Sequence, residues 1–457
     1  MEGRMPDKQS SAKATAQDAR ATLDEVERLI KKYPDVPQEA VFKEDMLRTG
    51  IAFDEPALRF ASEYKLKSYF IFSFDLEPVE GMEDEAHRHA PEEIALAGGA
   101  FGFRRTIVSV RLSSQSPYRV VLADEGDRLR LECCGVPIAD VALQDVPSYY
   151  RRQLQSGKPI TEMAPTIEWG YLVYLTVYRK CQYFGFEEEC QFCDINENFR
   201  QQVASGRPYN TVKKVDEILE ALEIIHDEDS EHRTEAYTLT GGSVTTQLHG
   251  RSEVEFYSQY AERIEERFPG RWIPKMVVQA WPRADLERAR ASGIKIYHPN
   301  YEVWDARLFS IICPGKDRAI GRDEWIRRVV DAADVFGASR VIPNFVAGVE
   351  MARPHGFETV DEALRSTGEG LDFFMSKGIT PRFTVWCPEP LSVLGRDQGP
   401  APLEYHVGLL RLWRDTLARH RLYAPPGYGQ PGSGHAVFSV SSFMDVIDPT
   451  TPVASLT

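Results

Sequence analysis

Beyond about residue 165, short apolar runs alternate with longer segments whose apolar residues recur every three or four positions. The short runs are rich in β-branched and aromatic residues, which is typical of buried strands. They lie at 171–179, 235–242, 275–281, 294–300, 340–350 and 380–390. The amphipathic segments between them predict helices at 215–227, 253–268, 284–293, 322–337 and 360–378.

This alternation predicts an α/β fold. Strands that alternate with helices form parallel sheets, because each helix returns the chain to the starting edge of the sheet. Six such units predict a (βα)6-type, partial or complete TIM-like barrel with its functional groups at the carboxyl ends of the strands. We expect the barrel over 161–400. A C-terminal helix and closing segment follow at 401–457, with a Gly/Pro-rich loop at 422–436.

The first third of the chain has a different pattern. Residues 1–17 are polar and predict a disordered tail, whereas 18–33 have the apolar spacing of a helix. Short β-rich runs follow at 66–76, 103–112, 118–124 and 129–136. We interpret 18–160 as an N-terminal α+β extension. Its adjacent Cys133 and Cys134 point to opposite faces of a strand and are read as packing residues.

Composition narrows the class of protein. The chain has 457 residues, of which 42% are hydrophobic, and a net charge of −15 that argues against nucleic acid as a partner. The polar N-terminus is not a signal peptide, and no apolar run approaches the roughly 20 residues of a membrane span. We therefore expect a cytoplasmic protein without membrane contact. In that reducing compartment, clustered cysteines indicate metal ligands or catalysts rather than disulfides.

One cysteine cluster follows directly on the first barrel strand. Cys181 and Cys190 are separated by eight residues, and Cys190 and Cys193 by two. Three thiolates on one loop can hold three corners of a [4Fe–4S] cluster, which leaves the fourth iron open to a small molecule. The alternative is a structural zinc site. Zinc normally takes four protein ligands, and no fourth Cys or His lies nearby in the sequence.

The segment Cys190-Gln191-Phe192-Cys193 resembles the cluster loop of the radical S-adenosylmethionine (SAM) superfamily, including the aromatic Phe192 before the last cysteine. The usual family spacing is three residues and then two, so the first gap here is atypically long. A longer loop adds little closure entropy and does not forbid a cluster. The resemblance implies a [4Fe–4S] cluster held by Cys181, Cys190 and Cys193.

Further segments resemble the SAM-binding parts of the same superfamily, and of its biotin-synthase-like subgroup in particular. The second barrel strand ends in a Gly-Gly turn, at the position that holds the SAM amino group; the fourth ends in an Asn-x-Glu pattern, at the position that contacts ribose; the fifth has apolar residues that could flank adenine. The cofactor-binding residues that this resemblance implies are Phe192, Thr240, Gly241, Gly242, Ser243, Asn300, Glu302, Val346 and Glu350. Arg322 is a further cofactor-binding candidate, because Arg322 and Arg327, on the helix after the Ile-Ile-Cys-Pro-Gly-Lys segment, could each pair with a carboxylate.

The resemblance implies reductive cleavage of SAM to a 5′-deoxyadenosyl radical, which abstracts hydrogen from a small-molecule substrate. The electron would come from a flavodoxin- or ferredoxin-type donor. Rearrangement, fragmentation or C–C bond formation in cofactor or specialised metabolism fits best, because the third and fifth strands lack the cysteines of a sulfur-donating cluster. Catalytic candidates are Tyr297, His298 and Cys387, and further pocket candidates are Arg382, Trp386 and Glu389.

Two other function classes stay open. A zinc-stabilised binding or scaffold protein would contain zinc and no iron. An iron–sulfur carrier would hold a cluster without cleaving SAM, but it would not need the Gly-Gly turn or the Asn300 and Glu302 pair.

Overall fold

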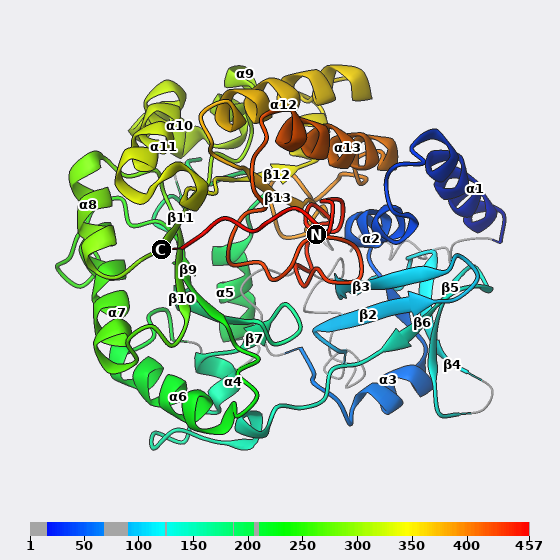
Figure 1. The fold of residues 1–457 in the computed structure, drawn as a ribbon, viewed down its shortest axis with the longest axis horizontal. Helices are drawn as coiled ribbons and strands as arrows, with labels where there is room; N and C mark the ends of the chain where they lie inside the picture. The colour runs from blue at the N-terminus through cyan, green and yellow to red at the C-terminus, as the bar shows by residue number, and fades with distance from the viewer. Residues whose placement is uncertain (1–15, 68–89, 124–125, 186, 205–209, 457) are drawn as a thin grey trace, which may run out of the picture.

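The computed structural model describes residues 16–67, 90–123, 126–185, 187–204 and 210–456. Figure 1 shows three neighbouring parts. Parallel strands with outer helices form one side, a second sheet forms the other, and the C-terminal segment runs between them.

The predicted parallel strands are present and nearly coincide with the apolar runs. They are β8 (Leu172–Tyr178), β9 (Ala236–Gly241), β10 (Ile273–Val278), β11 (Ile296–Pro299), β12 (Asn344–Ala347) and β13 (Arg382–Val385). The short β7 (Thr166–Ile167) precedes them and pairs with β8 in the antiparallel direction. The strands are almost wholly buried, which is why their sequences read as continuous apolar runs.

The parallel strands form two hydrogen-bonded groups. One sheet has the order β11-β10-β9-β8-β7, and β12 pairs with β13 separately. Single parallel bridges at Tyr297–Val341 and Glu302–Phe345 connect the groups. Pro299 and Pro343 stand at this junction and lack the N–H donors that a continuous ladder needs. The strands therefore follow one another around a partial barrel. The hydrogen-bonded ladders of the described residues do not close this barrel.

Helices cover the outside of the strands (Figure 1). The predicted ones are α6 (Val215–Glu228), α7 (Glu253–Arg267), α8 (Arg283–Ala291), α11 (Arg322–Phe336) and α12 (Val360–Met375). Capping boxes start α7, with Ser252 and Glu255, and α12, with Thr359 and Glu362. Shorter helices that the periodicity did not reveal are α4 (Ile160–Met163), α5 (Ile195–Ala204), α9 (Ala306–Ile312) and α10 (Pro314–Ala319), with 3-10 turns η3 (Ser148–Arg151), η4 (Ala338–Arg340) and η5 (Val349–Met351).

The N-terminal part is a helix-flanked sheet. Its helices are α1 (Ala16–Lys32), α2 (Gln38–Thr49) and α3 (Glu55–Ala61). Its strands are β1 (Ala52–Phe53), β2 (Glu93–Gly98), β3 (Phe103–Ser109), β4 (Tyr118–Leu122), β5 (Leu129–Cys133) and β6 (Val136–Ala142), in the order β1-β4-β5-β6-β2-β3. The expected strand at 66–76 lies almost entirely outside the described residues. Cys133 is buried and Cys134 exposed.

The C-terminal part joins the sheet to the barrel. Helix α13 (Leu403–Arg419) packs beside α12, and the chain then runs through 420–456 without regular structure. The Ser439 carbonyl accepts from the Ser109 amide of β3, and the Val440 carbonyl accepts from the Val385 amide of β13. Glu93 of β2 accepts from the amides of Glu168 and Trp169, just after β7. The space between β13 and β7 is thus lined by the N-terminal and C-terminal parts of the chain.

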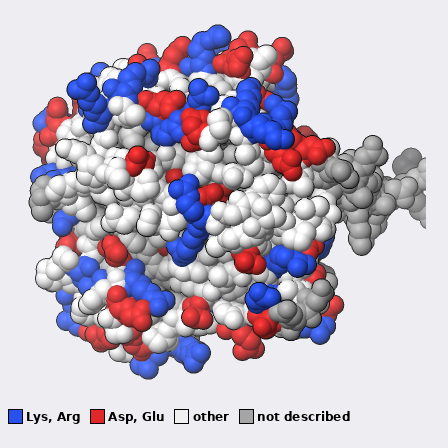
Figure 2. All heavy atoms as spheres, turned by 45° about the vertical axis from the view of Figure 1, so that its right-hand side comes forward, with Lys and Arg blue, Asp and Glu red and all other residues white. Residues whose placement is uncertain are grey.

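Basic and acidic side chains are interspersed over the face in Figure 2. Within the part of the chain that the structure describes, no helix is long and apolar enough to cross a membrane.

Candidate active site

A cavity of about 270 Å³ lies inside the partial barrel. Alternate residues of the strands face it, as the two-residue period of a strand requires. These facing pairs are Leu172 and Tyr174, Thr238 and Thr240, Lys275 and Val277, Asn344 and Val346, and Arg382 and Thr384. The loop that carries the three cysteines covers one end, and Phe438 and Val440 of the C-terminal segment close the side.

The described residues of the cysteine loop are tied to neighbouring elements at several points. The Asn196 side chain accepts from the Cys181 amide at 2.8 Å and donates to the Cys181 carbonyl at 3.1 Å. The buried Tyr183 hydroxyl donates to Gln279 at 2.7 Å, and the Gly315 amide donates to the Glu188 carbonyl at 3.1 Å. The residues that lengthen the first gap therefore have their own anchors, which explains how an atypical spacing still forms an ordered loop.

Cys181, Cys190 and Cys193 all line the cavity. Burial raises the pKa of the Cys181 thiol to about 11 and also raises that of Cys193. A hydrogen bond with the Cys313 thiol lowers the pKa of Cys190. Across the described ranges, no three Cys, His, Asp or Glu side chains are grouped to hold a single metal ion. A cubane cluster takes each thiolate on a different iron atom, so three thiols around one cavity fit that donor set.

The Gly-Gly turn lies directly against the cysteine loop. A Cβ at Gly242 would lie 1.7 Å from the Lys180 carbonyl oxygen, so only glycine permits this approach. The Tyr257 hydroxyl donates to the Gly242 carbonyl at 2.8 Å, and the Ser243 carbonyl accepts from the Gln182 amide at 2.9 Å. Thr240, Gly241, Gly242 and Ser243 line the cavity together with the three cysteines.

Glu253, at the start of α7, organises the loop after the Gly-Gly turn. Its carboxylate accepts from the Val244 amide, the Gln279 amide group and the Trp281 indole at 2.5–3.0 Å. Burial raises the pKa of Glu253 despite these donors. With these three donors, the buried Glu253 carboxylate holds the turn in position. The sequence did not single out Glu253, because a glutamate in the first turn of a helix is common.

Asn300 and Glu302 both line the cavity, after β11. The Asn300 Oδ1 atom is buried without a hydrogen-bond partner, which fits a group that awaits a donor. Glu302 forms a buried ion pair with Lys316 Nζ at 2.5 Å. Lys316 comes from the Ile-Ile-Cys-Pro-Gly-Lys segment, and the sequence analysis did not name it.

The cavity also receives Phe192 and Val346, but not Glu350. Glu350 is buried behind the strand end, where it accepts from the Gly348 amide at 2.7 Å and from the Thr367 hydroxyl at 2.9 Å. Burial raises its pKa. In this position Glu350 holds the end of β12 instead of reaching the cavity.

Three of the expected catalytic or binding residues lie behind the lining. Tyr297 directs its hydroxyl to the Trp281 amide and the Gln279 carbonyl, and its ring stacks on Phe336 of α11. His298 bonds the Ile342 carbonyl at 2.8 Å, and burial lowers its pKa well below the ordinary range. Arg322 donates to the Trp304 carbonyl and lies over the Trp304 ring.

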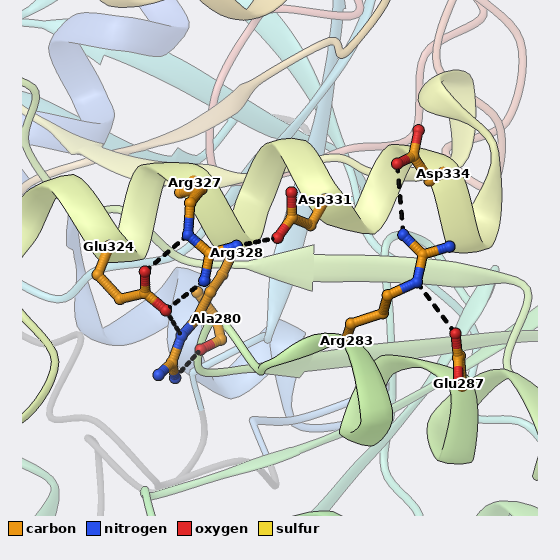
Figure 3. Close-up of polar contacts among 8 residues, drawn as sticks. All are labelled: Ala280, Arg283, Glu287, Glu324, Arg327, Arg328, Asp331 and Asp334. Carbon is orange, nitrogen blue, oxygen red and sulfur yellow. Dashed lines mark hydrogen bonds and ion pairs between the residues drawn. The ribbon is translucent and has the colours of Figure 1, made fainter.

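The remaining sequence candidates are placed as follows. Cys387 is buried and donates to Glu389 at 3.4 Å, while Glu389, Arg382 and Trp386 line the cavity themselves. Arg327 lies on the outer surface of α11, where Figure 3 shows it between Glu324 and Asp331. The same figure shows Arg283 of α8 paired with Asp334 of α11, so Arg283 joins these two neighbouring outer helices.

No protein-family model matches the sequence. The chain is 22% identical over 311 residues to bacteriochlorophyllide c C-7(1)-hydroxylase of Chlorobaculum limnaeum, covering 64% of this chain and 73% of that protein. This similarity supports an enzyme and leaves its reaction open. Among solved structures, methylornithine synthase matches with 13% identity and a TM-score of 0.39 over 57% of this chain and 65% of that one.

A second matching structure is coproporphyrinogen III oxidase from Escherichia coli, described as a radical SAM enzyme. It is 14% identical, with a TM-score of 0.34, over 62% of this chain and 56% of that one. The chain spans less than two thirds of the length of either solved structure.

Proposed function

We propose that the protein is a radical SAM enzyme of the biotin-synthase-like type, acting on a small molecule. One observation carries the proposal: the three cysteines, the Gly-Gly turn and Asn300 line a single cavity at the carboxyl ends of parallel strands. These features are up to 119 residues apart in sequence, from Cys181 to Asn300. A structural zinc site or a simple electron carrier gives no reason for the turn and the asparagine to face the thiols.

In this proposal Cys181, Cys190 and Cys193 hold a [4Fe–4S] cluster, and SAM binds beside it. When bound, the cluster and SAM together would supply reductive cleavage of the sulfonium and hydrogen abstraction by the 5′-deoxyadenosyl group. The Gly241–Gly242 backbone takes the amino group of SAM, because no side chain there keeps a ligand away. The unpartnered Asn300 Oδ1 accepts from a ribose hydroxyl, and Val346 packs against adenine.

The chain's other contribution is exclusion of water. Ile167, Leu172 and Val277 form an apolar wall, and the C-terminal segment covers the side that the sheet leaves open. Apolar walls of this kind exclude water and so protect a reactive species from solvent. The electron donor is proposed to be a flavodoxin- or ferredoxin-type protein.

The test uses protein purified without oxygen. We expect about four irons and four sulfides per chain, and 5′-deoxyadenosine after addition of dithionite and SAM. Cys190→Ala should lose both iron and product. Cys134→Ala, which changes an exposed thiol in the N-terminal part, is the matched control and should keep both. Zinc in place of iron, or a cluster that never cleaves SAM, would overturn the proposal.

A further inference from the structure

The deep end of the cavity is lined by charged side chains that the proposed cofactors do not use. Lys275 lies on β10, four residues before Gln279. At the rise per residue of a strand, Lys275 is about 13 Å further from the cysteine loop than Gln279 is. Arg382 begins β13, and Glu168 follows β7. All three line the same cavity as the cysteines. Two cations therefore share this floor with one carboxylate.

These charges are buried but not paired with one another. Lys275 is 1% exposed and Glu168 is 3% exposed. The ion pairs formed by the described residues, at up to 4.0 Å, do not include Lys275, Arg382 or Glu168. Lys275 donates to the Gly427 carbonyl at 2.9 Å and lies 3.9 Å from the centre of the Tyr428 ring. Burial lowers the pKa of Lys275 to about 7 and raises the pKa of Glu168 to about 7, so each charged form is costly here. A ligand that pairs with Lys275 and Arg382 would offset this cost.

Polar atoms of the floor that lack a hydrogen-bond partner support the same conclusion. The Thr238 hydroxyl, the Arg382 Nε atom and one Glu168 oxygen are buried without a hydrogen-bond partner. Thr238 is 2% exposed and lines the cavity. The guanidinium of Arg382 lies over the rings of Tyr428 and Phe438, which fix its position. Two donors and one acceptor, from three different strands or segments, thus stay unsatisfied around one space.

The balance of charge selects among anions. The net charge of the floor is +1 whether Lys275 and Glu168 are both charged or both neutral, because Arg382 keeps its charge in either case. This charge neutralises a monoanion and not a dianionic phosphate. A guanidinium and an ammonium are suited to a carboxylate. Next to the floor the wall is apolar, with Leu172, Val277 and Phe438. The floor therefore matches the acidic end of an otherwise apolar molecule.

We propose that Lys275 and Arg382 bind the carboxylate of the substrate, with Thr238 as a further donor, so that the substrate is a small organic acid. Glu168 faces the same space and accepts from a hydroxyl or ammonium group on the substrate. The inference deepens the proposed function, on which it rests for the presence of a substrate in this cavity.

The experiment uses acetate as the probe on the full chain with its reconstituted cluster, without SAM or reductant. Thermal unfolding is followed by circular dichroism at constant ionic strength. A ligand that binds only the folded state raises the unfolding temperature in a saturable way. We expect this for acetate, little for the neutral isostere acetamide, and a weaker effect for inorganic phosphate.

Variants locate the binding. Lys275→Met and Arg382→Met should weaken acetate at least about tenfold, the loss expected for one charge-assisted hydrogen bond. Lys213→Met is the control, since this buried lysine donates to the Met163 carbonyl and does not line the cavity. Arg382→Lys keeps the positive charge and replaces Arg382→Met in the experiment if the methionine variant does not fold.

Equal stabilisation of the wild type and the floor variants would overturn the proposal, since acetate would then bind elsewhere, such as the open iron. No stabilisation of the wild type, or preference for phosphate or acetamide, would overturn it too. The result is separable from the proposed function. Acetate binding at the floor without deoxyadenosine formation refutes radical chemistry alone, and the reverse result refutes the carboxylate site alone.

Discussion

At the scale of single residues, charge partners decide what a side chain can do. Glu302 has the position expected for a ribose contact, yet its carboxylate is held by Lys316 at 2.5 Å. A paired carboxylate still accepts further hydrogen bonds, so Lys316 orients Glu302 instead of removing it from the site. The lysine follows a cysteine and a proline in the sequence, and nothing in that pattern indicates its partner.

A second buried acid allows a prediction about pH. Glu44 of α2 accepts from the Ser442 amide at 2.7 Å, and burial raises its pKa to about 7. Its other neighbours are Lys43, Asp445 and His406, and burial keeps the imidazole of His406 neutral by lowering its pKa to about 3. A raised pKa means that the stability contributed by Glu44 is full below about pH 4.5 and is lost as the pH rises through about 7.

We therefore expect Glu44→Gln to match the wild type at pH 4 and to exceed its free energy of unfolding by about 2–3 kcal/mol at pH 8. Urea unfolding at both pH values measures the difference. Glu266→Gln, at an exposed position of α7, is the control and should change little at either pH. A Glu44→Gln variant less stable than the wild type at pH 8 would show that the carboxylate is ionised and stabilising.

At the scale of elements, the end of β9 and the cysteine loop form one unit. Gly242 packs against Lys180, and the Gln182 side chain accepts from the amides of Thr245 and Thr246 at 2.8 and 3.0 Å. These contacts fasten the cysteine loop to the Gly-Gly turn, so a displacement of one strains the other. The long first gap between the cysteines is accommodated because both sides of the loop are fastened to neighbouring elements.

This coupling predicts the effect of Gly242→Ala. The added Cβ must displace the Lys180 carbonyl, so the variant should lose about 2–3 kcal/mol of unfolding free energy. SAM affinity should fall at least about tenfold, with partial loss of iron, as measured by equilibrium binding and iron analysis. Gly399→Ala, where a Cβ meets nothing within 4 Å, should change neither quantity. Unchanged SAM binding in Gly242→Ala would show that the Gly-Gly turn does not contribute to the SAM site.

At the scale of the whole molecule, residues near the two ends of the chain pack together beside the barrel. Lys43 and Asp445 form a buried ion pair at 2.9 Å, and Lys43 also donates to the Phe438 carbonyl at 2.6 Å. Phe438 lines the cavity, so α2 supports the wall of the site from outside. The N-terminal part is thus structural support for a chamber built mainly by the barrel.

Breaking this pair should be costly. Lys43→Met leaves Asp445 buried and unpaired, and should lower the unfolding free energy by about 3 kcal/mol. The double variant Lys43→Met/Asp445→Leu should recover part of that loss, as measured in a denaturant double-mutant cycle. The exposed pair of Arg28 and Glu404 gives the comparison, since Arg28→Ala should cost less than about 1 kcal/mol. Additive effects of the two buried substitutions would show that Lys43 and Asp445 are not coupled.

The sequence by itself determined the local order of the fold. The parallel strands and their helices followed from periodicity, since β8 begins at Leu172 and α11 at Arg322 within one residue of the predicted positions. The three cysteines, the Gly-Gly turn and Asn300 were predicted from their resemblance to a known motif series, and the structure places all of them around one cavity. Short helices such as α9 escaped, because one or two turns contain too few residues to reveal a period.

Only the tertiary structure decided which side chains face the cavity. Tyr297 and His298 lie on β11, which precedes the cavity-lining Asn300, yet their side chains bond to the Gln279 and Ile342 carbonyls behind the lining. Lys275 and Glu168 are 107 residues apart in sequence, and only the fold shows that both line the same cavity. Burial and charge pairing depend on contacts between distant segments, and the one-dimensional pattern does not contain those contacts.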